Sequence, residues 1–173
     1  MNQDHRQVLH RLNCLAKDLD ALYHQAARQL GVADSVLIVA YTLHEKGDGC
    51  FLYDIYSDSG VSKQTINSAM RKLEGDGLLY LTQDKGKMKR VWLTDSGRDF
   101  VSRTAKRLFG AECRALDGWT EDELAEYVSL MTKYNQCFRR ELDHMEDEAD
   151  PTYSRASSGK NAGEQDETTH PAF

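Results

Sequence analysis

The sequence predicts a mainly α (α+β) fold, in which a helix-turn-helix and a two-stranded β-hairpin lie between long N- and C-terminal helices. Two observations lead to this prediction. Apolar side chains recur every three or four residues through long segments near both ends of the chain, which is typical of helices. In the middle of the chain, LLYLT and RVWLT flank a polar loop that contains glycine, which is typical of a β-hairpin.

The first 30 residues are expected to form one helix with an apolar seam. The seam positions alternate four and three residues apart, as in a coiled coil: Val8, Leu12, Leu15, Leu19, Leu22 and Ala26. Gly31 is expected to end this helix. A second helix is expected from Asp34, acting as its N-cap, to a stop at Gly47. Its residues 36–41 are apolar nearly all round, which predicts the most buried element of the fold.

A short helix over residues 51–57 and a turn over residues 58–60 lead into a longer helix over residues 62–74. The longer helix is expected to bury an apolar face: Ile66, Ala69, Met70 and Leu73. Its other face carries amide, hydroxyl and cationic groups and no acid before Glu74: Ser62, Lys63, Gln64, Thr65, Asn67, Ser68 and Arg71. Amide groups suit base edges in a major groove, and cations at a helix N-terminus suit phosphates. A solvated structural face is the alternative, although such faces usually mix Glu with Lys.

The predicted hairpin has strands over residues 78–82 and 90–94, joined by a loop that is rich in cations: Lys85, Lys87, Lys89 and Arg90. Between residues 60 and 92 there are seven basic and three acidic residues, whereas the whole chain has a formal net charge of −6. This basic loop has few acids to pair with, and it could follow a phosphate backbone or enter a minor groove. A lysine cluster that protects a sheet edge is the alternative.

After the hairpin, Thr94 is expected to cap a single helix over residues 95–116. Thr120 and Glu123 form a capping box before a last helix. This last helix carries a second seam: Leu124, Val128, Met131, Phe138, Leu142 and Met145. Residues 148–173 are polar, acidic and poor in apolar side chains, so we expect a disordered acidic tail that cannot offset its ordering entropy.

Residues 50–97 resemble the winged helix-turn-helix of the MarR family of bacterial transcriptional regulators. The matching pieces are Gly60-Val-Ser-Lys-Gln-Thr-Ile, Leu73-Glu-x-x-Gly-Leu-Leu and Val91-x-Leu-Thr-x-x-Gly97. The resemblance implies a homodimer that binds a pseudo-palindromic operator in double-stranded DNA. It also implies an N-terminal dimerisation helix over residues 1–30, a DNA-binding domain over 31–97 and C-terminal dimerisation helices over 98–147.

The hairpin, or wing, departs from the family pattern. The family usually carries Asp-x-Arg before the Leu-Thr pair, but here Lys85 falls at the Asp position and Lys87 at the Arg position, with Asp84 nearby. Lysine contacts phosphate as a point charge and lacks the planar fork with which arginine binds. The usual wing-tip ion pair and the insertion of an arginine are therefore not expected.

The resemblance implies a transcriptional regulator, and we expect a repressor that a small organic effector releases. One alternative is a redox-responsive regulator that uses Cys14 as its sensor. Another is a winged-helix module that holds protein partners and binds DNA weakly. His10, Cys14 and His24 could recruit zinc, but their spacing is not a recognised ligand pattern, so neither a metal nor a cofactor is expected.

Other functional classes lack a sequence signal. There is no nucleophile elbow, phosphate-binding glycine loop or His-Glu-x-x-His motif, so no enzyme is expected. The four cysteines are scattered without a Cys-x-x-Cys pair, which argues against a zinc ribbon and a disulfide scaffold. The N-terminus lacks the order of a signal peptide, and no apolar run approaches the ~18 residues of a membrane span. We therefore expect a cytoplasmic location and no membrane association.

Overall fold

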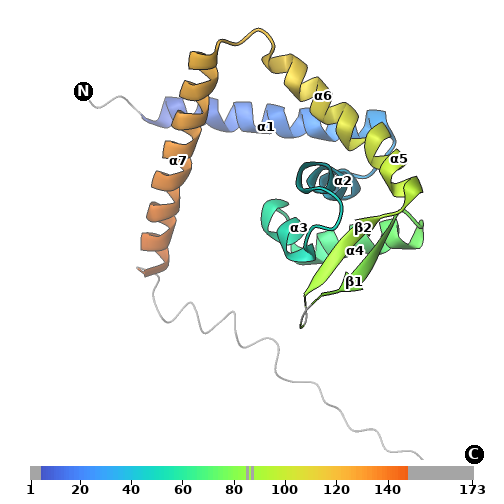
Figure 1. Ribbon diagram of the computed structural model, residues 1–173. Coiled ribbons are helices and arrows are strands. Elements are labelled where there is room, and N and C mark those ends of the chain that lie inside the picture. The colour runs from blue at the N-terminus through green and yellow to red at the C-terminus, as the bar shows by residue number, and fades with distance from the viewer. Residues whose placement is uncertain (1–4, 85, 87, 148–173) are drawn as a thin grey trace, which may run out of the picture. The chain divides into compact units, whose positions relative to one another are not determined.

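The computed structural model describes residues 5–84, 86 and 88–147, and these form helices and one β-hairpin (Figure 1). The predicted mainly helical fold class is confirmed. The chain divides after Asp117 into two compact units. The first contains α1 (His5–Leu30), α2 (Asp34–Lys46), α3 (Leu52–Asp58), α4 (Lys63–Gly75), β1 (Leu79–Gln83), β2 (Lys89–Leu93), α5 (Asp95–Arg103) and α6 (Ala105–Leu116). The second contains α7 (Glu121–Asp147).

Helix α2 lies at the centre of the first unit. Six of its 13 residues are buried, including Val39 and Ala40, as the apolar run over residues 36–41 predicts. The other elements pack their apolar side chains against it, and the buried cluster is Val36, Val39, Ala40, Leu43, Ile55, Ile66, Ala69, Met70, Leu73, Leu79, Val91, Leu93, Val101 and Ala105. Burial of these side chains is the main favourable contribution to folding. It also fixes which side of each surrounding helix faces solvent.

The hairpin is held to the helical core by a short segment before α3. Strands β1 and β2 pair antiparallel, from Leu79 opposite Leu93 to Gln83 opposite Lys89. Gly49 N donates to Val91 O over 2.9 Å, so the segment lies along the outer edge of β2. Gly49 has a φ of +86°, and an added Cβ would lie 2.7 Å from the Trp92 ring. Only glycine fits this position, where backbone conformation and packing both exclude a side chain.

Two local predictions are wrong in the first unit. Asp34 does not cap α2, because Ala33 occupies the N-cap position and the Asp34 carboxylate instead lies 2.7 Å from His24 Nδ1. The single helix expected over residues 95–116 is broken at Thr104, whose φ of −116° and ψ of −87° are not helical. The Thr104 hydroxyl donates to Phe100 O over 2.7 Å, which gives the side chain a local partner at the break.

The second unit begins with the predicted capping box. Thr120 N donates to Glu123 Oε2 over 2.8 Å, and Glu123 N donates to Thr120 Oγ1 over 3.2 Å. The Thr120 hydroxyl also donates to Glu123 Oε2 over 2.9 Å, and the two hydrogen bonds that this carboxylate accepts, first from the Thr120 backbone and then from its hydroxyl, lower the pKa of Glu123 below its ordinary value. The capping box thus gives partners to the Thr120 and Glu123 N–H groups at the start of a long helix.

The apolar seams of α1 and α7 lie in solvent. In α1 the exposed seam residues are Val8, Leu12, Leu15, Leu19 and Leu22. In α7 they are Val128, Met131, Phe138, Leu142 and Met145. None of the described α7 side chains is buried. Within the part of the chain that the structure describes, no helix is long and apolar enough to cross a membrane.

The predicted division into residues 1–30, 31–97 and 98–147 stays a prediction. The proposed acidic tail over residues 148–173 lies outside the described residues.

Candidate nucleic-acid interface

Helix α4 presents the predicted polar face to solvent. Its apolar residues point into the core, where Ile66 is fully buried. The opposite side chains are all exposed: Ser62, Lys63, Gln64, Thr65, Asn67, Ser68 and Arg71. Ser62 caps the helix by accepting a hydrogen bond from Thr65 N over 3.2 Å. The N-terminus of α4 is therefore an exposed, capped end with cationic and amide side chains around it.

Hydrogen bonds within the chain divide this face into two kinds of group. The hydroxyls of Ser62 and Thr65 bond to each other over 2.9 Å, and Ser68 Oγ donates to Gln64 O over 3.1 Å. These three hydroxyls therefore already have partners within the helix. In contrast, the side chains of Lys63, Gln64 and Arg71 make no hydrogen bond or ion pair with another described residue.

Asn67 is oriented by a residue that sequence reasoning missed. The Tyr56 hydroxyl, in α3, donates to Asn67 Oδ1 over 2.6 Å. This bond fixes the plane of the amide and leaves the Asn67 NH2 group available as a donor. Tyr56 thus acts as a positioning residue for the exposed face, and only the packing of α3 against α4 brings the two residues together.

Charge on α4 is distributed unevenly. Lys63 lies at the start of the helix and Arg71 lies further along the same exposed side, and neither has a carboxylate within 4 Å among the described residues. Lys72 is instead paired with Asp76 over 3.1 Å near the C-terminal end. The exposed side thus keeps two uncompensated positive charges next to amide groups.

The cations of the hairpin differ in their surroundings. Lys85 and Lys87 lie outside the described residues, and Lys89 is exposed in β2. Arg90 does have partners within the chain, contrary to the expectation for this loop. Its Nε donates to Asp84 Oδ2 over 2.7 Å and its Nη1 donates to Gly49 O over 2.8 Å.

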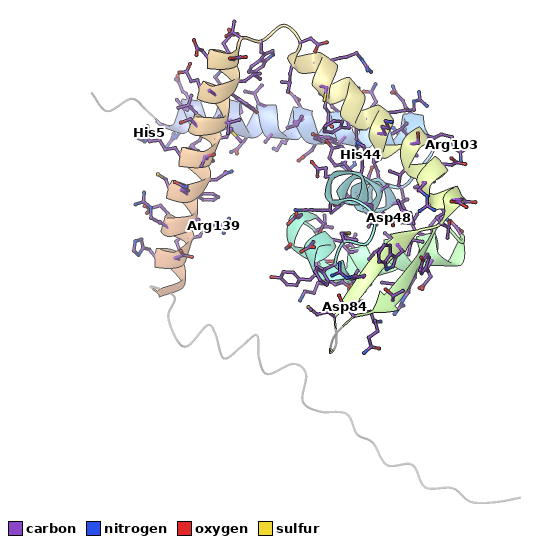
Figure 2. All side chains as sticks on the ribbon, in the orientation of Figure 1. His5, His44, Asp48, Asp84, Arg103 and Arg139 are labelled. Carbon is purple, nitrogen blue, oxygen red and sulfur yellow. The ribbon has the colours of Figure 1, made fainter. Side chains whose placement is uncertain are left out.

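Arg90 therefore anchors the loop end of the hairpin to the segment before α3. Its guanidinium also lies 4.0 Å from the centre of the Phe51 ring, a distance typical of a cation–π contact. Asp84 directly follows β1 and lies towards the tip of the hairpin in Figure 2, so the Arg90 contacts join this end of the hairpin to the segment before α3. An arginine held by three contacts is less available to DNA than an exposed lysine.

The thiols offer limited support for the redox alternative. Cys14 is exposed and its Sγ lies 3.7 Å from His10 Nε2. Cys50 is half-buried, and burial raises the pKa of its thiol. His24 pairs with Asp34 and not with Cys14. Among residues 5–84, 86 and 88–147, no three His, Cys, Asp or Glu side chains are grouped so as to hold a metal ion.

A cavity of about 580 Å³ lies between α1, α2, α6 and the turn that leads into α4. On its wall, the Glu112 carboxylate accepts hydrogen bonds from the Tyr23 hydroxyl over 2.6 Å and the Tyr41 hydroxyl over 2.5 Å. Burial, and then the neighbouring Glu112, raise the pKa of Tyr41 above its ordinary value. Sequence reasoning missed this cluster, because its members are 71 and 89 residues apart.

Together, the capped α4 with its exposed polar face and the hairpin that follows define a winged helix-turn-helix. The chain has the same fold as solved structures of MarR-family transcriptional regulators. One from Silicibacter pomeroyi has a TM-score of 0.58 and 21% identity, over 73% of this chain and 86% of that chain. The S. aureus MepR–DNA complex has a TM-score of 0.62 and 18% identity, over 79% of this chain and 99% of that chain.

A third similar structure is that of Bordetella bronchiseptica BpsR, a protein whose DNA binding is regulated by 6-hydroxynicotinic acid. It has a TM-score of 0.58 and 21% identity, over 75% of this chain and 98% of that chain. No protein-family model matches the sequence, and no curated protein is significantly similar to it.

Proposed function

We propose that this protein is a sequence-specific, DNA-binding transcriptional regulator of the MarR type. The observation that carries the proposal is the exposed face of α4, where amide groups and unpaired cations surround a helix N-terminus. Helices of this kind enter the major groove with their N-terminal residues against base edges. The similar MepR structure is a DNA complex, which supports the same use of the fold. We place the protein in the cytoplasm, where it would reach chromosomal DNA, and assign it no catalytic activity.

The residues of the interface take different parts in this proposal. Gln64 and Asn67 carry amides that can donate and accept hydrogen bonds at base edges. Three hydroxyl groups stabilise the first turns of α4 and contact the DNA backbone: those of Ser62, Thr65 and Ser68. The cations contact phosphate groups: Lys63, Arg71, Lys85, Lys87 and Lys89. Arg90 contributes by holding the hairpin in place, because its guanidinium is already bound within the subunit.

We propose further that the protein acts as a homodimer. Helices α1 and α7 each expose a row of apolar side chains, which is typical of a surface that another subunit covers. A symmetric dimer would present two copies of α4 to one face of DNA. Half-sites about one helical turn apart, roughly 34 Å, match such an arrangement and predict a pseudo-palindromic operator.

A small organic effector is proposed to bind in the cavity and release repression. Ser59 and Val61 line the cavity, and both lie in the turn that leads directly into α4. A molecule seated there would therefore press on the element that positions the polar face. BpsR, whose DNA binding is regulated by 6-hydroxynicotinic acid, is a similar structure in which a small molecule acts on DNA binding.

Binding measurements on DNA test the assignment of roles. Gln64→Ala should relax the preference between specific and random duplexes by about 1–3 kcal/mol, because a base contact is lost. Lys89→Ala should weaken binding to all sequences alike and lower the salt slope by about one. Lys133→Ala, on α7, is the matched control for the loss of one exposed lysine and should change neither quantity.

Duplexes selected from genomic fragments supply the specific sequence for these measurements. If the Gln64 and Lys89 variants both bind every duplex as the parent protein does, α4 and the hairpin do not form the interface. Binding that is insensitive to salt would instead favour the alternative of a protein-interaction module, since phosphate contacts make DNA affinity fall with salt.

A further inference from the structure

The cavity between α1, α2 and α6 carries an unusual excess of negative charge. Five carboxylates line it, together with a single imidazole, that of His24: Asp20, Asp34, Glu45, Asp58 and Glu112. Among the described residues that line the cavity there is no lysine or arginine. A ligand that enters this space therefore meets groups that are negatively charged at neutral pH.

Only two of the five carboxylates lie within 4 Å of a basic side chain among the described residues. Asp34 lies 2.7 Å from His24, and Asp58 lies 2.6 Å from Lys46. Hydrogen bonds from Lys46 and Ser57 lower the pKa of Asp58, so this carboxylate stays ionised. Within the described part of the chain, Asp20 and Glu45 have no cationic side chain within 4 Å.

Glu112 is the third carboxylate without a cation. Its two partners, Tyr23 and Tyr41, are neutral hydroxyls that satisfy the oxygens but leave the negative charge uncompensated. Glu112 is half-buried, so water screens its charge less than it would on an open surface. A cation placed beside Glu112 would therefore gain more than one beside an exposed carboxylate.

The remainder of the wall suits an apolar body. Leu37, Ile38 and Leu108 contribute aliphatic surface, and Tyr23 and Tyr41 contribute rings. A volume of about 580 Å³ lies within the range of pockets that hold small organic molecules, about 300–1,000 Å³. Aromatic rings next to carboxylates also favour a cation over their faces.

We infer that this cavity binds organic cations: molecules with one or two apolar rings and a permanent positive charge, which pairs with Glu112 and Glu45. Organic anions are disfavoured there, because the carboxylates repel them. A second cavity of about 320 Å³ between α1 and α6 is lined by Lys106, Arg107 and Arg114, and it is a better match for anions. The inference rests on the proposed effector function for its regulatory meaning, but the binding itself can be measured without DNA.

The contacts of Glu112 also explain how such a ligand would act. The two tyrosine hydroxyls tie α1 and α2 to the same carboxylate in α6. A cation that pairs with Glu112 competes with these hydroxyls. Binding therefore loosens α1 from the α2–α6 contact at the same time as it fills the space beside the turn before α4.

Isothermal titration of the full chain with three matched probes tests the charge preference. The probes are 4-biphenylmethyl-trimethylammonium, the neutral 4-biphenylmethanol and the anionic 4-biphenylacetate. We expect the cation to bind at least about tenfold more tightly than the alcohol at low salt, with the preference shrinking as salt rises. The anion should bind more weakly than the alcohol in this cavity, and Lys106→Gln should remove any residual anion binding.

Glu→Gln variants then test whether the cation binds in this cavity. Glu45→Gln should reduce cation affinity about threefold to tenfold and leave alcohol affinity unchanged, since Glu45 has no hydrogen-bond partner among the described residues and only its charge is removed. Glu112→Gln should reduce cation affinity by a similar factor, and it also replaces one of the two oxygens that accept the tyrosine hydrogen bonds. Glu126→Gln, a carboxylate on α7 outside the cavity, is the matched control and should leave all three affinities unchanged. Two substitutions on different helices keep the test valid if one of them perturbs folding.

Two results would overturn the inference. One is an alcohol or anion that binds as tightly as the cation, and the other is a cation affinity that neither Glu variant changes. The same preparations are assayed for specific duplex binding in the absence of any probe. Loss of duplex specificity would reject the proposed regulator while leaving the cation preference intact, so the two failures can be told apart.

Discussion

Helix α2 and helix α7 both carry apolar side chains at helical spacing, but those of α2 lie in the core and those of α7 lie in solvent. Six of the 13 residues of α2 are buried, whereas none of the described side chains of α7 is. Helix α1 resembles α7 in this respect, with Ala27 its only buried residue among those described. The comparison shows that periodicity identifies the apolar face of a helix but not the surface that covers it.

Two rows of exposed apolar residues on one chain call for an explanation. Scattered exposed leucines are normal on a folded protein, but rows of five such side chains are not. A second copy of the chain is the occupant that we propose for both rows. If that is so, the terminal helices depend on association in a way that the core does not.

The largest effect is expected when a charge enters the α1 row. Leu19→Glu should weaken the homodimer by roughly 3–6 kcal/mol, because two copies of the substitution each remove a buried leucine from the interface. Sedimentation should show a monomer at concentrations where the parent is dimeric. Gln25→Glu adds the same charge to an exposed polar position of α1 and should leave the dimer intact. A Leu19→Glu protein that remains a dimer would show that this row is not part of the interface.

A smaller effect is expected when one leucine is shortened in the core. Leu73 in α4 is 3% exposed, and Leu73→Ala should lower the free energy of unfolding by about 2–5 kcal/mol at any protein concentration. Leu15 in α1 is 64% exposed, so Leu15→Ala should matter only where the dimer forms. Urea denaturation over a range of protein concentrations separates the two cases. If both variants lose the same free energy of unfolding at every protein concentration, the core and the terminal helices do not differ in their dependence on association.

A smaller loss is expected where α2 is tied to α6. Tyr41→Phe removes a hydroxyl that donates to the charged Glu112 carboxylate and should cost about 1–2 kcal/mol of unfolding free energy. Tyr134→Phe removes a hydroxyl that has no hydrogen bond to another described residue and should cost almost nothing. Thermal unfolding of both variants measures the difference. If they are equally stable, the Tyr41–Glu112 bond does not hold the first unit together.

The smallest effect is a pH dependence at the start of α7. The pKa of Glu123 is lower in the folded chain than in the unfolded chain, so its stabilisation is fully present above the ordinary value of about 4.3. It is lost as the pH falls through the lower, folded-state pKa. Helicity of α7 followed by circular dichroism should therefore decline in that acidic window, and Glu123→Gln should remove this part of the decline. Glu126→Gln should leave the profile as it is in the parent protein.

Local chemistry explains why much of the candidate interface could be predicted. Ser62 caps α4 and Ile66 fixes the buried side, so the exposed positions of Gln64 and Arg71 follow from a repeat of 3.6 residues. The Thr120–Glu123 capping box is equally local and is confirmed. In each case the contacts join residues within one or two helical turns, which a sequence pattern can specify.

Long-range contacts explain what could not be predicted. Arg90 looked like a free cation because its partner Gly49 is 41 residues away, and Tyr56 meets Asn67 only after α3 packs on α4. The break at Thr104 interrupts a segment whose composition is helical throughout. Local propensity is a weak prior where packing decides the outcome.

The sequence by itself determined the order of helices and strands, the polar side of α4 and the two apolar rows, because these depend on neighbours a few residues apart. The tertiary structure alone decided which cations are already bound and which carboxylates gather around one cavity. Glu112, Tyr41 and Tyr23 come from three different helices. The carboxylate and its two hydroxyl partners meet only after the hydrophobic burial of α2 has brought those helices together.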